Sequence, residues 1–283
     1  MKPIIKYPGG KSNEIKSFID YIPKNYNRYV EPFVGGGALY FYLEPKNAWI
    51  NDINGHLINF YLTVRDNFDR LKKELNLLAE IYNSNQKDFS EEMKNKEDDS
   101  FIKNKNEALY YKIRDMFNGK IDRDFTDAAL YYFINKTAYS GMLRFNSKGE
   151  YNVPFGRYKK LNADIVSEAH SKLLDGAKIT QQDYSVVFEE CNEDDFIFLD
   201  PPYDCTFTEY GNINGNDFSH DKHIKLAQDF KNLSSKAMMI IGKTDFIEEL
   251  YKPYIKGEYQ KKYSVNIRNR FKAESKHLII ANY

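Results

Sequence analysis

The sequence predicts an α/β protein in which a helical block is inserted into a mostly parallel sheet. Three observations lead to this fold class. The first fifty residues read as strand, turn, helix and strand, apolar strand-like runs return late in the chain, and a helical spacing of apolar residues fills much of the interval. The length of 283 residues accommodates one large or two ordinary folding units.

The composition excludes several other classes of protein. With 42% hydrophobic and 16% aromatic residues the chain can bury a full core, and no apolar run approaches the roughly 18 residues of a membrane span. The only apolar run before the first glycines is Ile4-Ile5, which is too short for the apolar region of a signal peptide, so we expect no signal peptide. Cys191 and Cys205 are too few for a disulfide framework or a zinc site, so we expect a reducing, cytoplasmic location.

The charges balance overall but are unevenly placed. The chain has 41 basic and 41 acidic residues, which argues against a protein that holds nucleic acid by bulk charge alone. Between residues 134 and 160, however, six basic residues stand against one acidic residue, and residues 261–276 repeat this ratio. Such runs commonly mark a solvated surface, so charge by itself leaves a nucleic-acid face and an ordinary surface both open.

The N-terminal elements are predicted to form half of a nucleotide-binding unit. They are a strand over residues 29–31, a glycine turn over 33–37, a helix over 38–43 and a strand over 48–52. Glycines at such a turn let backbone N–H groups approach a ligand, and Asp52 follows Gly35 by 17 residues, near the spacing at which an acid binds a ribose. An ordinary tight turn fits equally well, and the spacing does not separate a nicotinamide cofactor from S-adenosylmethionine.

The middle of the chain is predicted to be helical. From residue 57 to residue 82 apolar residues recur at steps of four and three, which is typical of a helix or a helix pair broken at Asp66-Asn67. Residues 83–106 are polar and without a period, which predicts a mobile loop. Helical patterns return at residues 109–117 and 128–139.

Strand signals dominate the last third of the chain. They cover residues 179–180, 196–199, 237–241, 263–267 and 278–281, and we expect the last two runs to pair antiparallel. A helix is predicted to start near Ser219. We therefore expect a catalytic sheet domain built from residues 1–56 and 169–283, with a helical domain inserted at residues 57–168.

The strand over residues 196–199 ends in the tetrapeptide Asp200-Pro201-Pro202-Tyr203. Open α/β sheets bind ligands beyond the carboxyl ends of their strands, so these residues should lie at a ligand site. An amine on an aromatic ring is a poor nucleophile, because its lone pair is delocalised. Acceptors at the Asp200 carboxylate and the Pro201 carbonyl would grip its two N–H groups and aim the lone pair at a methyl donor, while Tyr203 would stack on the ring.

Other chemistries fail on spacing. Gly10-Lys11-Ser12 and Gly242-Lys243-Thr244 lack the upstream glycine that a phosphate loop needs. Neither cysteine follows a proline, as the nucleophile of cytosine ring-carbon methylation usually does. The 5 histidines show no metal-ligand spacing, so we predict no catalytic metal.

Taken together, these motifs resemble a known family. In order and distance, residues 7–11 (YPGGK), 31–37 (EPFVGGG), 51–54 (NDIN) and 200–203 (DPPY) are similar to motifs of the Dam-type (D12 class) DNA adenine N6-methyltransferases. The stretch 135–158 resembles the family as well, and the likeness covers nearly the whole chain. It implies a Rossmann-like S-adenosylmethionine-dependent methyltransferase sheet with an inserted helical DNA-recognition domain.

The resemblance also implies roles for individual residues. Catalysis on a flipped adenine would fall to Asp200, Pro201, Pro202 and Tyr203. The S-adenosylmethionine site would include Tyr7, Lys11, Phe33, Gly35, Gly37, Asp52, Asp183 and Asp200. DNA would be contacted by Lys6, Tyr139, Ser140, Met142, Arg144, Pro154, Arg157 and Tyr158. In such enzymes a tyrosine like Tyr139 wedges into the duplex and an arginine like Arg144 reads a guanine. Independently of the resemblance, guanine is the base that arginine most commonly contacts.

The expected reaction is methyl transfer to adenine N6 in duplex DNA, within the family's usual target GATC. Cytosine N4 is a near alternative, RNA adenine and a glutamine amide are more distant ones, and a catalytically silent DNA-binding relative or a dinucleotide oxidoreductase are the other classes. Relatives often carry asparagine where this chain has Ser140. We expect a monomer with no membrane contact, and a restriction endonuclease of the same specificity is a candidate partner.

Overall fold

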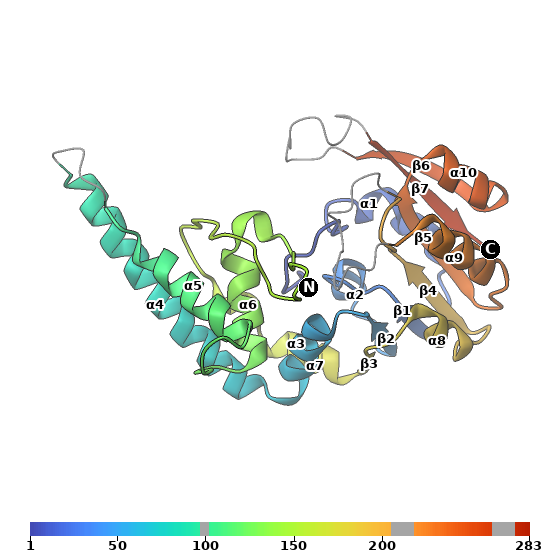
Figure 1. Ribbon diagram of the computed structural model, residues 1–283. Helices are drawn as coiled ribbons and strands as arrows, with labels where there is room; N and C mark the ends of the chain where they lie inside the picture. Colours follow the sequence, from blue (N-terminus) through green and yellow to red (C-terminus); the bar gives the residue numbers. More distant parts are fainter. Residues whose placement is uncertain (97–101, 205–217, 262–274) are drawn as a thin grey trace.

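A mixed sheet forms the centre of the molecule. The computed structural model describes residues 1–96, 102–204, 218–261 and 275–283. Within them, seven strands lie in the order β3-β2-β1-β4-β5-β7-β6 (Figure 1). Their bounds are β1 Arg28–Glu31, β2 Ala48–Asn51, β3 Ala177–Thr180, β4 Asp195–Leu199, β5 Lys236–Gly242, β6 Ile255–Lys261 and β7 Ser275–Ala281. The α/β class that the sequence predicts is confirmed.

The strand pairing places the expected ligand-binding edge of the sheet beside β1. Strands β1 to β5 pair in parallel, whereas β7 runs antiparallel to both β5 and β6. β1 lies between β2 and β4, so that Val30 pairs with Trp49 on one side and with Ile197 on the other. The strand order therefore reverses at β1, and open α/β sheets bind ligands at the carboxyl ends of the strands beside such a reversal.

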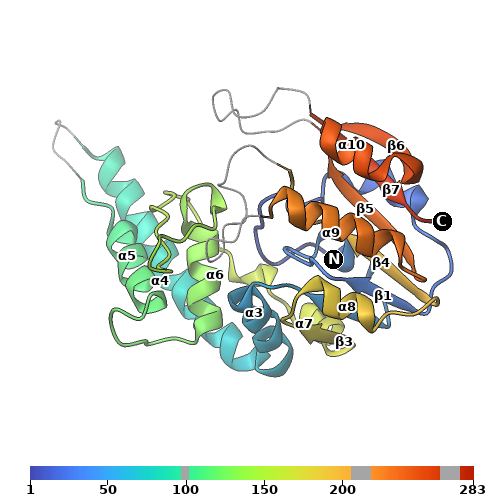
Figure 2. The same cartoon turned by 45° about the vertical axis from the view of Figure 1, so that its right-hand side comes forward.

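Helices cover both faces of the sheet. Alternate residues of a strand point to opposite faces, and β4 divides accordingly: Phe196 and Phe198 join one core cluster, while Ile197 and Leu199 join the other. Helices α8 (Tyr184–Glu189), α9 (His220–Lys231) and α10 (Asp245–Tyr251) complete the second cluster and lie in front of the sheet in Figure 2. Helices α1 (Ile15–Phe18), α2 (Ala38–Leu43) and α7 (Glu168–Asp175) pack into the first cluster.

A helical block stands beside the sheet. It contains α3 (Gly55–Asp66), α4 (Phe68–Lys94), α5 (Lys105–Phe117) and α6 (Asp127–Thr137). α3 and α4 meet at Asn67, which confirms the predicted break. α4 and α5 run along each other and project away from the sheet as an arm (Figure 1). The first core cluster continues through Tyr61 and Val64 of α3 into this block, so the block shares a core with one face of the sheet.

The predicted mobile loop over residues 83–106 is largely wrong. α4 continues to Lys94, and α5 already begins at Lys105. Some of the polar side chains that suggest a loop have partners across the block. The side chain of Asn83, for example, exchanges two hydrogen bonds of 3.0 Å with the backbone of Leu161. Tertiary contacts of this kind override the local composition.

The C-terminal edge of the sheet is an antiparallel pair of strands. The run 263–267, predicted to pair with the last strand, lies outside the described residues, as does Cys205. In the described part β7 pairs with both β5 and β6, and β6 is a strand that the sequence did not suggest. The start of α9 is confirmed, since the Ser219 hydroxyl accepts a hydrogen bond from the Lys222 amide. Across the described ranges, no helix combines the length and apolar character needed to span a membrane.

Candidate active site

The glycine turn follows β1 at the carboxyl edge of the sheet. Gly35 and Gly37 have φ angles of 46° and 64°, in the left-handed region that side chains disfavour. A Cβ added at Gly35 would lie 2.9 Å from the Tyr7 ring. The Gly35 N–H donates to Asp52 (2.9 Å) and the Gly37 N–H to the Val34 carbonyl (2.7 Å). Gly35 therefore provides room for Tyr7 and Gly37 for Phe41, and both N–H groups are used within the protein, by Asp52 and by Val34.

Asp52 follows β2 and faces this turn. One carboxylate oxygen accepts the Gly35 N–H and the other accepts the Asn54 N–H, both at 2.9 Å. Burial raises the pKa of Asp52 to about 6, although these N–H groups oppose the rise. The spacing of Asp52 from Gly35 thus brings its carboxylate to the glycine turn, and each oxygen keeps a lone pair for a further donor.

Asp200, directly after β4, is paired with a buried lysine. Lys11 Nζ lies 2.5 Å from Asp200 Oδ1 and donates a second hydrogen bond to the Gly9 carbonyl at 3.0 Å. The Lys11 side chain is 1% exposed and that of Asp200 is 21% exposed. Burial raises the pKa of Asp200, while the Lys11 charge opposes the rise. Two residues 189 positions apart in the sequence therefore form one charged pair at the ligand edge.

The Tyr203 ring lies beside this pair. Its centroid is 4.9 Å from Lys11 Nζ, and the ring sits edge-to-face against His277, with centroids 5.2 Å apart and planes at 83°. A Cβ added at Gly242, the last residue of β5, would meet the ring at 3.6 Å. Residues from β5 and β7 thus support the aromatic face of the tetrapeptide, next to the buried Pro201.

Glu31, the last residue of β1, adds a third carboxyl group at this edge. It is buried and accepts a hydrogen bond of 2.7 Å from the Tyr29 hydroxyl. Burial raises the pKa of Glu31 well above its usual value, and the nearby charges of Asp200 and Asp52 raise it further. The sequence reasoning assigned Glu31 no role. An acid directly after Tyr29-Val30, at the end of the strand, was the available signal.

The remaining cofactor candidates lie on the α8 side. Phe33 is half-buried, with its ring 5.3 Å from that of Tyr184 and 6.2 Å from that of Phe218. Asp183 is exposed and caps α8, where its Oδ1 accepts hydrogen bonds from the amide and the hydroxyl of Ser185. Its other oxygen, Oδ2, takes no part in these capping bonds.

The DNA candidates between residues 138 and 158 form a paired ribbon after α6. The Tyr139 amide donates to the Pro154 carbonyl at 2.9 Å, and Ala138 bridges antiparallel to Phe155. Farther along, Arg144 Nε donates to the side chain of Asn152 at 2.8 Å, which leaves the terminal guanidinium nitrogens for other partners. The structure therefore brings together candidates that lie 15 residues apart, Tyr139 and Pro154.

Lys6 joins this ribbon from the N-terminal segment. Its amide and carbonyl exchange hydrogen bonds of 3.0 and 2.7 Å with the Asn135 side chain, and its Nζ lies 3.8 Å from the Tyr158 ring centroid. The same N-terminal segment carries Tyr7 and Lys11, so it connects the ribbon to the carboxyl edge of the sheet. The exposed candidates are Lys6, Tyr139, Ser140, Arg144, Pro154 and Arg157, whereas Met142 and Tyr158 are half-buried.

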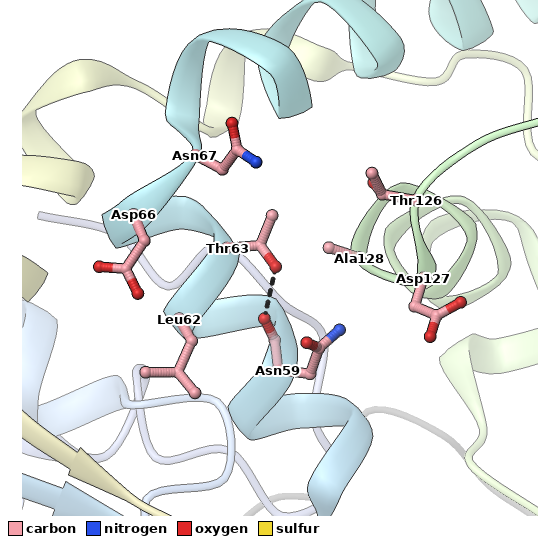
Figure 3. Close-up of a pocket in the computed structure, with 8 residues that line it drawn as sticks. All are labelled: Asn59, Leu62, Thr63, Asp66, Asn67, Thr126, Asp127 and Ala128. Carbon is pink, nitrogen blue, oxygen red and sulfur yellow. Dashed lines mark hydrogen bonds between the residues drawn. The ribbon is translucent and has the colours of Figure 1, made fainter.

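A separate hollow of about 430 Å³ lies between α3 and the start of α6 (Figure 3). Polar side chains such as Asn59, Thr63 and Asp127 line it, and Thr63 donates a hydrogen bond to the carbonyl of Asn59. None of the residues predicted for the active site lines this hollow. Among the described residues, no cluster of three or more His, Cys, Asp or Glu side chains is arranged to hold a metal.

The sheet order, the glycine turn after β1 and the acid after β2 define a Rossmann-like ligand-binding enzyme. The chain belongs to the D12 class N6 adenine-specific DNA methyltransferase family, whose family model matches residues 7–267. This match confirms the resemblance that the motifs indicate. It also confirms the prediction that the chain is an adenine-specific DNA methyltransferase.

Several named relatives match over most of the chain. The chain is 36% identical to the Type II methyltransferase M.CviBI of Paramecium bursaria Chlorella virus NC1A, over 100% of both chains. It is 35% identical to the Type II methyltransferase M.MjaIII of Methanocaldococcus jannaschii, over 100% of this chain and 99% of the relative. It is 27% identical to the DNA adenine methylase of Haemophilus influenzae, over 88% of this chain and 82% of the relative.

Proposed function

We propose that the chain transfers a methyl group from S-adenosylmethionine to adenine N6 within GATC in duplex DNA. The observation that carries this proposal is the Lys11–Asp200 pair beside the Tyr203 ring, at the carboxyl edge of the sheet next to the glycine turn. It combines an acceptor for an amine, a surface for stacking and a charged group to hold the acceptor in place.

The chemistry of this edge suits the proposed cofactor. Glu31, Asp52 and Asp200 bring three buried or half-buried carboxyl groups to the ends of neighbouring strands, and burial raises the pKa of each. A ligand with a positive charge and hydroxyl donors would relieve that desolvation. S-adenosylmethionine, when bound, supplies an activated methyl group on a positively charged sulfur. Tyr7 and Asp52 at the turn, together with Phe33, would hold it.

The reacting amine would be held by fixed acceptors. Lys11 occupies Asp200 Oδ1, so Oδ2 is the oxygen that would accept one N–H of the adenine amine, and the Pro201 carbonyl would accept the other. These two bonds would draw the lone pair out of conjugation. Proline restricts the backbone, so the carbonyl needs little reorganisation. Extruding the base costs a few kcal/mol, which stacking on Tyr203 and the pocket contacts would offset.

Recognition would fall to the paired ribbon and Lys6. In this proposal Tyr139, 57% exposed, enters the duplex beside the flipped base, and Arg144 reads a guanine through the nitrogens that Asn152 leaves available. Ser140, Met142 and Pro154 would touch neighbouring bases. Arg157 and Tyr158 would contact the backbone. Residues 57–168 would form the recognition domain and the rest of the chain the catalytic domain.

The test of target and product is methyl incorporation into duplexes that differ from a GATC duplex at one base pair, followed by nucleoside analysis. We expect N6-methyladenine from GATC, with each substitution lowering kcat/KM by about 1–3 kcal/mol in equivalent free energy. N4-methylcytosine as the product, or equal rates on all duplexes, would contradict the proposal.

The test of the site is the pair Asp200→Asn and Asp200→Ala. Loss of a preorganised acceptor should lower kcat by at least about 10²–10³-fold in both variants. DNA binding, measured by fluorescence anisotropy, should stay close to that of the unmodified chain, because the ribbon is separate from β4. A variant that keeps full activity would remove Asp200 from the mechanism.

We further propose that the enzyme acts as a monomer and has a restriction endonuclease of the same specificity as a partner. Support for the partner comes from the names of the relatives M.CviBI and M.MjaIII, both Type II methyltransferases. Sedimentation of the protein with and without one duplex would measure the stoichiometry, and a ratio of one chain per duplex is expected.

A further inference from the structure

A buried carboxylate lies behind the candidate site. Glu14, just before α1, is 8% exposed. Its Oε2 accepts a hydrogen bond of 2.8 Å from the Tyr259 hydroxyl and also pairs with His277 Nδ1 at 2.8 Å. Its Oε1 pairs with Lys261 Nζ at 2.7 Å. These partners belong to β6 and β7, so Glu14 ties the N-terminal segment to the antiparallel edge of the sheet.

Glu14 is held in its charged form. Burial alone would raise the pKa of Glu14, but the hydrogen bonds from His277 and Lys261 outweigh it and bring the pKa to about 2. Burial also lowers the pKa of His277, against the opposing effect of Glu14. A neutral His277 therefore carries its proton on Nδ1, facing Glu14, and the orientation of the ring is set.

From Glu14, two successive contacts lead to each of the two groups that would grip the base, Asp200 and Tyr203. The Glu14 amide donates to the Lys11 carbonyl at 2.7 Å, and Lys11 pairs with Asp200. On the other side, the His277 ring lies against the Tyr203 ring, with 5.2 Å between centroids. An ordinary stabilising ion pair would not need a position between these two groups.

We propose that Glu14 and His277 are positioning residues for methyl transfer: Glu14 orients the His277 ring, and that ring sets the tilt of Tyr203, on which the target base stacks. Neither residue touches substrate, and both act through Tyr203. The inference rests on the function proposed above, since it needs a base on Tyr203.

Three variants separate the ring contact from its anchor. His277→Asn keeps an N–H donor toward Glu14 and removes the ring from Tyr203. His277→Phe keeps a ring and removes the donor, and Glu14→Gln keeps the size of the side chain and removes its charge. The matched control is His170→Asn. His170 is another buried histidine, whose Nε2 lies 3.0 Å from the Lys2 carbonyl in a separate part of the fold.

The readouts are chosen so that a loss of stability alone does not produce the expected result. We expect single-turnover methylation by His277→Asn, corrected for folded fraction, to fall about 10- to 100-fold, with Kd for duplex DNA and for S-adenosylmethionine changed less than about twofold. A duplex with 2-aminopurine at the target base should be brighter with this variant, because the flipped base stacks less closely on Tyr203. Glu14→Gln should show a smaller change in the same direction, and His170→Asn should show none.

The outcomes distinguish this inference from the proposed function. If the unmodified chain fails to bind S-adenosylmethionine or to methylate adenine, the proposed function falls, whatever the variants do. If the unmodified chain is active, unchanged rates and unchanged 2-aminopurine fluorescence in His277→Asn and Glu14→Gln overturn the positioning role. Loss in His277→Phe with full activity in His277→Asn also overturns it, because the ring contact would then be dispensable.

Discussion

At the scale of single residues, the cofactor-binding role proposed for Asp52 would make cofactor binding sensitive to acid. Its pKa of about 6 in the folded chain is raised by burial, so the carboxylate is ionised above that pH and becomes protonated as the pH falls through it. A protonated Asp52 has less capacity to accept hydroxyl hydrogen bonds and carries no charge. We expect the Kd for S-adenosylmethionine to rise by up to about tenfold per pH unit below pH 6, measured by calorimetry.

Asp52→Asn is the control for this titration. Burial also raises the pKa values of Glu31 and Asp200 at the same edge, so part of any pH dependence belongs to them. The Asn variant should bind weakly at pH 8 and lose the dependence around pH 6. If Asp52→Asn binds S-adenosylmethionine with the same pH profile as the unmodified chain, the profile comes from Glu31 and Asp200 instead.

Ser140 adopts a backbone conformation that suits another residue. Its φ of 53° and ψ of 14° lie in the left-handed region, which costs most side chains about 1–2 kcal/mol and which asparagine visits more readily. Ser140→Asn should therefore raise the free energy of unfolding by up to about 1 kcal/mol, measured by thermal melting. A fall in stability would indicate that the Ser140 side chain makes a contact that outweighs its backbone conformation.

Only some of the residues at the candidate site could be predicted from the sequence. The glycine turn, Asp52 and Asp200 could be predicted because each directly follows a strand, and strand ends converge on one edge. Glu14 and His277 could not be predicted, since their contact joins residues that are neighbours only after β6 and β7 have closed the sheet. Free N–H groups on the glycine turn were a reasonable expectation, but the Gly35 N–H donates to Asp52 and the Gly37 N–H to the Val34 carbonyl.

At the scale of elements, the geometry of the paired ribbon over residues 138–158 depends on Gly156. A Cβ at this position would lie 2.6 Å from the Ala138 carbonyl oxygen, a backbone atom that cannot rotate away. Gly156→Ala should force the two segments of the ribbon apart, lowering stability by about 1–3 kcal/mol and weakening DNA binding. Binding of S-adenosylmethionine, measured in parallel, should change little, because the sheet is untouched.

Gly176→Ala is a matched control for this variant. A Cβ there would make ordinary contacts of 3.6 Å with the Leu173 and Lys46 carbonyls. DNA binding should therefore be retained. Equal loss of DNA binding in both alanine variants would show that the effect of Gly156→Ala is not local to the ribbon.

Most elements follow from local sequence, and the misses share one cause. The strands β1, β2 and β4 are short, nearly continuously buried runs, and the helix pair α3 and α4 has a strong apolar period over residues 57–82. The second half of α4 has few apolar residues and is helical because side chains such as Asn83 find partners across the block. β6 was missed for a related reason, as alternate residues from Ile255 to Lys261 are exposed and only its pairing with β7 makes it a strand.

At the scale of the whole molecule, DNA affinity should depend on salt despite a net charge of zero. The six basic residues between 134 and 160 lie in a segment with one acid, so their local field is not cancelled there. We expect the logarithm of the DNA association constant to fall linearly with the logarithm of salt concentration, and the slope to lessen by about one in Arg157→Ala. Affinity for S-adenosylmethionine should vary much less with salt. An unchanged slope in Arg157→Ala would show that this side chain contacts no phosphate.

The interleaving of distant segments in the sheet has a consequence for biosynthesis. Arg28 pairs with Asp195, 167 positions later, and the last residues of the chain complete the neighbour of β5. Pairings between segments so far apart close late and slowly. Until β6 and β7 have been synthesised, the nascent polypeptide lacks the antiparallel strands and the histidine that lies behind Tyr203. The candidate site therefore gains the contact of His277 with Tyr203 late in synthesis, after the helical block and the parallel strands.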